Sequence, residues 1–202
     1  MKLYHSPTSP YVRKVMVTLH ETGQTGDVTL VPVSGTPLSP AQGLVTKNPL
    51  TKIPALERPD GCTLYDSRVI CRFLDSRAEA GLYPQGARGW ETLTLEATGD
   101  GITDAAVLMT YEVRLRAEAQ RMDAYLDAQW AKIENACAAL NARWISHLSG
   151  PLDAGQIAVA CALGYVDFRH DARGWRKGND ALAAWYDRFA KRDSMQLTCP
   201  PA

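Results

Sequence analysis

Residues 2–19 read KLYHSPTSPYVRKVMVTL and predict a strand followed directly by a helix. Lys2–His5 is typical of a short strand. From Val12 on, apolar residues recur at i, i+3, i+4 and i+7, which predicts an amphipathic helix from about Pro10 to Thr22. Gly23 is a natural C-terminal stop for that helix. The chain therefore opens with a strand and a helix that can pack against it.

The next sixty residues continue the alternation of strands and helices. Val28–Val33 is rich in β-branched residues and predicts a second strand, whereas Ser34–Pro49 is broken by prolines and reads as a loop. Ala55–Glu57 and Thr63–Tyr65 flank a Pro-Asp-Gly turn and predict a hairpin. A helix follows over Ser67–Arg77. The order β-α-β, then β-β-α, predicts an α/β domain with a small four-stranded mixed sheet over residues 1–80.

The rest of the chain shows only helical patterns. A Gly- and Pro-containing linker is expected over residues 81–89, followed by an all-helical domain over residues 90–202. Asp153 and Gln156 have the form of a capping box, with Gln156 reaching back to open a buried helix. The expected helices span Glu91–Arg116 (weakened by Gly99 and Gly101), Trp130–Leu148, Ile157 to about Phe168, and the segment from Leu182 to Phe189.

Composition excludes several classes of protein. The chain has 202 residues, with 22 Lys+Arg against 22 Asp+Glu, so its formal net charge is zero and nothing favours nucleic-acid binding. The N-terminal residues do not resemble a signal peptide, and Ala154–Val166 is too short for a membrane span, so we expect a cytoplasmic protein. Five cysteines without a Cys-x-x-Cys pair, and four scattered histidines, predict neither a disulfide framework nor a metal site.

Ser9 is the first candidate for chemistry. It is well placed as the N-cap of the first helix, with Pro10 at the first helical position. The free N–H groups and dipole of a helix start favour an anion, and a hydroxyl there can stabilise a thiolate and lower the pKa of its thiol. The alternative is that Ser9 only caps the helix. Thr8 and Ser6 are close enough to share or replace its role.

Two further motifs follow. In NPLTKIPAL, residues 48–56, Pro54 begins a strand; if the Ile53–Pro54 bond is cis, the backbone of Ile53 can pair with an extended peptide. The alternative is an ordinary trans proline. Asp66 and Ser67 stand at a helix N-terminus and suit the ammonium and carboxylate of an amino-acid head group, although plain helix capping is a common use of both residues.

These motifs together, in this order, resemble the thioredoxin-fold domain of the glutathione S-transferases. The resemblance rests on TSPYVRK (residues 8–14), NPLTKIPAL (48–56) and LYDS (64–67), and on IAVACALGYVDFR (157–169), which is similar to the core helix of that family's C-terminal domain. It covers essentially the whole chain. Gln156 departs from the Asp that is frequent in the family, and Arg192-Asp193-Ser194 departs from its Arg-Pro-Ser.

The resemblance implies a role for each matched residue. Ser9 would stabilise the glutathione thiolate, since a serine there cannot form the mixed disulfide of the cysteine-type members. The backbone at Ile53 and Pro54 would bind the cysteinyl part, and Asp66 and Ser67 the γ-glutamyl end. Lys52 is a candidate for the glycyl carboxylate. A second-substrate pocket would involve three residues by position alone: Tyr11, Met109 and Tyr111.

The function implied is conjugation of the glutathione thiolate to an apolar electrophile, in a detoxification enzyme that uses glutathione as co-substrate. The resemblance also implies a homodimer, with the helix bearing Arg68 and Arg72 facing the partner, although solvated arginines are the commoner case. Two alternatives stay open. One is a non-catalytic glutathione- or ligand-binding protein. The other is a glutathione-dependent peroxidase, reductase or isomerase, for which Cys62 and Cys71 are untested.

Overall fold

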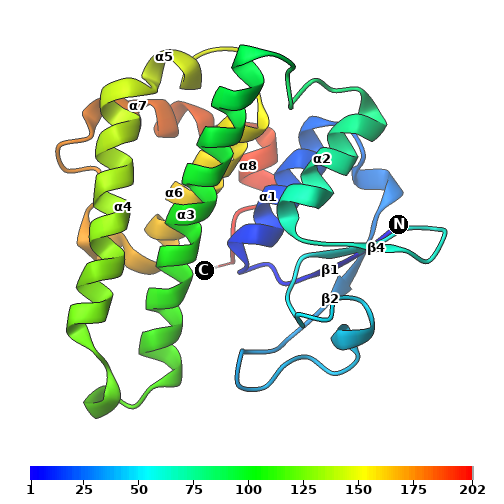
Figure 1. The fold of residues 1–202 in the computed structure, drawn as a ribbon, viewed down its shortest axis with the longest axis horizontal. Helices are drawn as coiled ribbons and strands as arrows, with labels where there is room; N and C mark the ends of the chain where they lie inside the picture. Colours follow the sequence, from blue (N-terminus) through cyan, green and yellow to red (C-terminus); the bar gives the residue numbers. More distant parts are fainter. Residues whose placement is uncertain (202) are drawn as a thin grey trace. The chain divides into compact units, whose positions relative to one another are not determined.

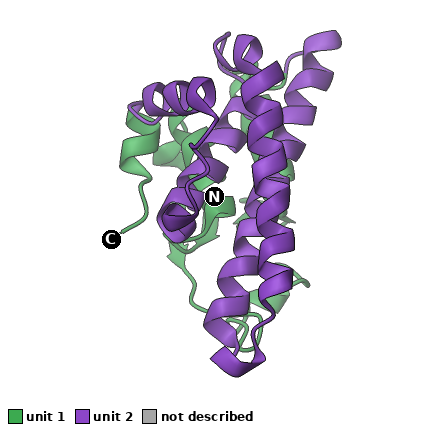
Figure 2. Cartoon of the chain, turned by 90° about the vertical axis from the view of Figure 1, so that its left-hand side faces the viewer, with its two compact units in different colours: residues 1–83, 193–202 green, residues 84–192 purple. Residues whose placement is uncertain are grey.

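The computed structural model describes residues 1–201, which divide into two compact units (Figure 2). The first contains Met1–Tyr83 together with the residues from Asp193 on, and the second contains Pro84–Arg192. The break after Tyr83 falls within the stretch 81–89. The grouping differs from the expected domains at the C-terminus, because the residues from Asp193 on belong to the first unit instead of the helical one.

The first unit contains a four-stranded mixed sheet, as predicted (Figure 1). Its strands are β1 (Lys2–His5), β2 (Thr29–Pro32), β3 (Ala55–Glu57) and β4 (Thr63–Leu64), in the spatial order β2-β1-β3-β4. β1 pairs with β2 in parallel and with β3 in antiparallel fashion, and β4 is antiparallel to β3. The parallel pair is joined through a helix, as parallel strands require.

Helices α1 (Pro10–Glu21) and α2 (Ser67–Ala78) supply the rest of the core of this unit. Buried side chains from β1 and β3 meet the apolar faces of both helices. Burying one such aliphatic side chain is worth about 1.5–3 kcal/mol, so this face holds the unit together. The cluster consists of Leu3, Val15, Leu19, Leu56, Ile70, Cys71 and Leu74.

A short helix that was not predicted, α8 (Asp193–Leu197), completes the first unit. The buried guanidinium of Arg13 donates from Nη2 to the carbonyl of Met195 at 3.0 Å. This contact joins residues 182 positions apart, so no local pattern could have predicted it.

Helices are the only regular secondary structure in the described residues of the second unit, as predicted. Three boundaries differ clearly from the expectation. The first helix begins at Ala87, inside the predicted linker. The helix predicted over Trp130–Leu148 begins earlier, at Asp123, and is divided at Trp144. The α-helices are α3 (Ala87–Leu115), α4 (Asp123–Arg143), α5 (Ile145–Leu148), α6 (Ala154–His170) and α7 (Asp180–Phe189).

Helix α6 is the centre of this unit, because every residue from Ala154 to Val166 is buried. Gly99 of α3 explains how closely the two helices approach: a Cβ there would lie 2.6 Å from the backbone carbon of Ala158. A glycine that lowers helix propensity is therefore required by packing. Gly101 has open space around its Cα, so its presence has no such explanation.

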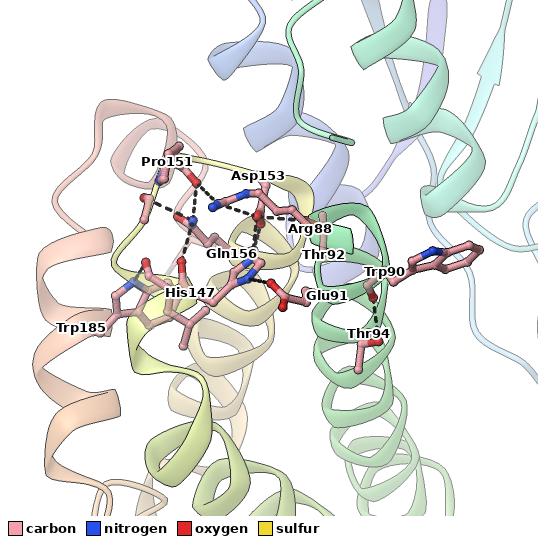
Figure 3. Close-up of polar contacts among 12 residues, drawn as sticks. Arg88, Trp90, Glu91, Thr92, Thr94, His147, Pro151, Asp153, Gln156 and Trp185 are labelled. Atoms are coloured by element: carbon pink, nitrogen blue, oxygen red, sulfur yellow. Dashed lines mark hydrogen bonds and ion pairs between the residues drawn. The ribbon is translucent and has the colours of Figure 1, made fainter. Parts of the chain in front are cut away.

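Asp153 caps α6 from a buried position, with 1% of its surface exposed (Figure 3). Its Oδ1 accepts from the backbone N–H of Gln156 at 3.1 Å, as the capping motif predicts. The return bond of Gln156 is different from the expectation, since its Nε2 donates to the carbonyl of Pro151 at 2.6 Å. The other carboxylate oxygen, Oδ2, accepts from Thr92 Oγ1 at 3.0 Å, His147 Nε2 at 2.7 Å and Arg88 Nη2 at 3.2 Å.

Candidate functional site

The start of α1 is organised by Ser9, as the sequence predicts. Its backbone is extended (φ −84°, ψ 122°), and its Oγ accepts from the backbone N–H of Val12 at 3.3 Å. A hydroxyl has one proton and two lone pairs, so this capping bond leaves the proton free to be donated elsewhere. Ser9 is half-buried. The capping role and a donor role are therefore compatible in the same side chain.

Two more hydroxyls lie beside it. Ser6 Oγ and Thr8 Oγ1 are 3.3 Å apart, and both side chains are half-buried. The first turn of α1 contains no acidic residue, so nothing in that turn neutralises the positive end of its dipole. Three hydroxyl groups thus lie at or just before a helix start that favours an anion.

The second motif forms a tight turn, Asn48–Pro54, ahead of β3. Asn48 is 2% exposed, and its side chain ties the turn together: Nδ2 donates to the carbonyl of Lys52 at 2.8 Å, and Oδ1 accepts from the N–H of Leu50 at 2.9 Å. The Ile53–Pro54 peptide bond is cis, as one of the two sequence alternatives requires. Over residues 1–201, no group pairs with the backbone N–H or carbonyl of Ile53. That backbone is consequently available to an extended ligand.

The third motif begins α2. Asp66 is its N-cap, with Oδ1 accepting from the N–H of Arg68 at 3.0 Å, so the capping interpretation of this residue is confirmed. Asp66 itself is exposed, whereas Ser67 is 2% exposed. The Tyr65–Asp66 peptide bond is also cis. The exposed carboxylate attracts a positive group, and the positive end of the helix dipole attracts a negative one. Together they suit a ligand that carries both charges.

The sheet brings these three motifs to one end. Tyr4 lies opposite Ala55 in the antiparallel pair β1–β3, so the segment after His5 and the turn before β3 leave the sheet at the same end. Leu56 lies opposite Leu64 in the pair β3–β4, so Asp66 follows at that end as well. Three segments from distant parts of the chain therefore converge on one edge of the first unit.

A polar cluster on β1 and β3, joined by Lys47 of the preceding loop, was not predicted from the sequence. Tyr4 Oη donates to Glu57 Oε2 at 2.7 Å, and Lys47 Nζ lies 2.9 Å from the same oxygen. The hydrogen bond from Tyr4 and then that from Lys47 lower the pKa of Glu57, and Glu57 raises the pKa of Lys47. The alternation of side chains along β1 and β3 could have indicated that Tyr4 and Glu57 lie near one another. The position of Lys47 could not be predicted, because it depends on how the loop before β3 folds.

The remaining predicted residues are more dispersed. Lys52 is exposed in the Asn48–Pro54 turn, and Tyr11 is half-buried in α1 of the first unit. Met109 and Tyr111 are on α3 in the second unit, where Met109 is 2% exposed and Tyr111 half-buried. The side chain of Met109 is thus part of the helical core. A pocket formed by these residues stays a prediction.

Comparisons with known proteins place the chain in a family. The glutathione S-transferase N-terminal domain matches residues 8–77, and the C-terminal domain of the same family matches residues 123–188. A glutathione transferase family member from Pseudomonas fluorescens Pf-5, with bound glutathione, is 48% identical and has a TM-score of 0.97, covering 100% of this chain and 99% of that one. The chain belongs to the glutathione S-transferase family.

Two further relatives of this glutathione S-transferase family chain span its whole length. A second structure of a Pseudomonas fluorescens Pf-5 family member, with bound S-(propanoic acid)-glutathione, has a TM-score of 0.93 at 47% identity and covers 100% of both chains. The uncharacterized GST-like protein YibF of Escherichia coli K12 is 31% identical over 205 residues, covering 100% of this chain and 99% of that protein.

None of the five cysteines lies in the three motifs of the candidate site. Cys62 is exposed, and Cys71 is buried in α2, where its sulfur accepts from Thr18 Oγ1 at 3.3 Å. Burial raises the pKa of Cys137 to about 12, so that thiol stays protonated at neutral pH.

Among the described residues, no group of three or more His, Cys, Asp or Glu side chains is arranged to hold a metal ion. No helix within residues 1–201 is long and apolar enough to cross a membrane.

Proposed function

We propose that this protein binds glutathione at the converging edge of its first unit and conjugates the glutathione thiolate to an electrophile. The observation that carries the proposal is the convergence itself: a hydroxyl-capped helix start, an unpaired backbone at Ile53 and the Asp66–Ser67 helix start leave one end of one sheet. A glutathione-bound relative at 48% identity along the full chain supports it.

Each part of the tripeptide has a proposed partner. The thiolate accepts a hydrogen bond from Ser9, with Thr8 or Ser6 as the alternative donor. The cysteinyl backbone pairs with Ile53 beside Pro54, and the γ-glutamyl ammonium and carboxylate bind Asp66 and the start of α2 at Ser67. Lys52, which is exposed in the turn, is proposed for the glycyl carboxylate.

The proposed reaction is an addition or substitution at carbon. The free thiol has a pKa near 8.5, so lowering it increases the fraction of thiolate, which is the nucleophile. The bound S-(propanoic acid)-glutathione of the relative contains a thioether. Addition of a thiolate to acrylic acid gives such an adduct: the carbon–sulfur bond forms, and the displaced electron pair takes up a proton from water. We therefore propose an α,β-unsaturated acid as one member of the substrate panel.

The second substrate and the assembly follow from the same proposal. Tyr11, Met109 and Tyr111 are the proposed contacts of the electrophile, and a homodimer is proposed to form through the α2 surface that exposes Arg68 and Arg72. Light scattering after size-exclusion chromatography tests the dimer, since a monomer at assay concentration contradicts it. The predicted cytoplasmic location and detoxification role stay predictions.

The test combines binding with turnover. Calorimetry should detect glutathione binding, and mass spectrometry should detect thioether products with at least one of acrylic acid, an aryl halide or another carbon electrophile. Binding without any product favours the ligand-binding alternative. Turnover of a hydroperoxide or disulfide alone favours the peroxidase or reductase alternative, in which case Cys62→Ser and Cys71→Ser identify any thiol involved. The absence of binding contradicts the proposal as a whole.

A further inference from the structure

The Asn48–Pro54 turn is held together by hydrogen bonds between its own residues. Asn48 closes the turn through its side chain, and the N–H of Thr51 donates to the carbonyl of Asn48 at 2.8 Å. These hydrogen bonds close the turn on itself. At its end Pro54 leads directly into β3, and a second attachment to the sheet comes from the residue just before Asn48.

Lys47 provides that attachment. Its Nζ lies 2.9 Å from Glu57 Oε2, and Glu57 is the last residue of β3. The same oxygen accepts from Tyr4 Oη at 2.7 Å, and Tyr4 is on the neighbouring strand β1. Tyr4, Glu57 and Lys47, called here the anchor triad, connect the start of the turn to β3, into which the turn leads, and to the neighbouring strand β1.

The protonation states of the anchor triad are stable around neutral pH. The hydrogen bonds from Tyr4 and Lys47 lower the pKa of Glu57, so its carboxylate stays ionised and accepts from both partners. Burial, and then the hydrogen bond to Glu57, raise the pKa of Tyr4, so the phenol keeps the proton it donates. The triad therefore persists through the pH range in which a thiol ionises.

We infer that the anchor triad positions the Asn48–Pro54 turn so that the backbone of Ile53 is held ready for the cysteinyl backbone of glutathione. The inference rests on the proposed function and adds to it three positioning residues, none of which touches the tripeptide. A partly exposed ion pair contributes little to global stability, since the side chains of Lys47 and Glu57 are 30% and 18% exposed. Loss of the triad should therefore reduce glutathione binding far more than it reduces folding.

The experiment compares Lys47→Ala, Glu57→Gln and Tyr4→Phe with the wild type by calorimetry and steady-state kinetics. One hydrogen bond is worth about a three- to tenfold change in affinity, so each variant should raise the Kd and KM for glutathione by about that factor. The kcat at saturating glutathione should stay unchanged. Melting temperatures should shift by about 2 °C or less. The double variant Lys47→Ala/Glu57→Gln should bind no more weakly than the weaker-binding single variant, because both substitutions act on the same Lys47–Glu57 ion pair.

Three controls separate positioning from other roles. Arg58→Ala breaks the exposed Arg58–Asp60 pair of the β3–β4 hairpin, and should leave the Kd unchanged. Lys47→Arg keeps a cation that reaches Glu57, so its Kd for glutathione should be close to that of the wild type, unlike that of Lys47→Ala. γ-Glutamylcysteine, which lacks the glycyl carboxylate, should show the same relative loss with Lys47→Ala as glutathione does.

Three results would overturn the inference. The first is an unchanged Kd in the Lys47 and Glu57 variants while the wild type binds normally, which leaves the proposed function intact. The second is a loss with Lys47→Ala that disappears for γ-glutamylcysteine, because Lys47 would then contact the glycyl carboxylate directly. The third is a wild type that does not bind glutathione, which overturns the proposed function and this inference together.

Discussion

Ser9 Oγ accepts a hydrogen bond from the backbone N–H of Val12 at 3.3 Å, so the proposed thiolate donor is also the cap of α1. The two roles predict different magnitudes when the hydroxyl is removed. A lost N-cap destabilises a protein by about 1 kcal/mol. A lost hydrogen bond to a charged group costs about 1.5–3 kcal/mol.

Ser9→Ala should therefore lower kcat/KM at neutral pH by about ten- to a hundredfold, with a loss of only about 1 kcal/mol in the free energy of unfolding. Ser9→Thr keeps the hydroxyl and serves as the matched control, with activity near that of the wild type. Ser6→Ala and Thr8→Val decide between the three hydroxyls. If Ser9→Ala retains full kcat/KM while one of the others loses it, the donor has been misassigned.

Asp66→Asn separates capping from charge recognition at the start of α2. Asparagine caps helices as well as aspartate does, so the bond to the N–H of Arg68 and the melting temperature should be maintained. The lost negative charge should raise the Kd for glutathione by about tenfold, because the γ-glutamyl ammonium loses its partner. Calorimetry and thermal unfolding of this variant measure both effects. An unchanged Kd would show that Asp66 only caps the helix.

Asp153→Ala should destabilise the second unit strongly. It removes the N-cap of α6 and leaves Thr92 Oγ1 and the His147 ring without their buried acceptor. We expect a loss of about 3 kcal/mol in the free energy of unfolding, measured by denaturant titration. Asp180→Ala, an exposed residue in the first turn of α7, is the control and should change it by about 0.5 kcal/mol or less. Equal effects of the two substitutions would contradict this account of the cap.

His170 should make the protein less stable in mild acid. Burial lowers its pKa below the usual value of 6.5. The hydrogen bond to the Ala106 carbonyl acts in the opposite direction and raises the pKa, whereas the positive charges of Arg173 and Arg169 lower it further. A histidine whose pKa is lower in the folded state contributes stability that is fully present above the pKa of the unfolded state. This stability is lost as the pH falls through the pKa of the folded state.

His170→Gln keeps a side-chain donor for the Ala106 carbonyl, which His170 Nε2 approaches to 2.9 Å, and removes the titration. The variant should lose less stability than the wild type between about pH 7 and about pH 5. Denaturant unfolding at a series of pH values measures the difference. Parallel pH profiles for the two proteins would show that this imidazole does not contribute to acid sensitivity.

Local sequence signals were sufficient for much of the first unit. The cap at Ser9, the proline at the first helical position and the apolar spacing all lie within twelve residues, so α1 could be predicted almost to its ends. The β3–β4 hairpin was predictable for the same reason, because its turn contains Pro59 and Gly61, the latter with a φ of 84°.

Contacts between distant residues account for what could not be predicted. The 3–4 spacing of apolar residues continues through Trp144, where the chain nevertheless ends α4 and begins α5. Gly99 is unfavourable in a helix until the backbone of Ala158 is placed against it. The attachment of α8 depends on Arg13, and the anchor triad depends on Lys47 reaching a strand ten residues away. Each of these features depends on tertiary contacts, which the periodicity of apolar residues does not reveal.

The ionisation of bound glutathione tests the central claim most directly. Thiolate absorbance of the glutathione complex, titrated against pH, should give a midpoint at least one unit below the value near 8.5 of a free thiol, and Ser9→Ala should move that midpoint back by about one unit or more. A midpoint that equals the free value in the wild type, or one that Ser9→Ala leaves in place, would contradict the account of thiolate stabilisation at the start of α1.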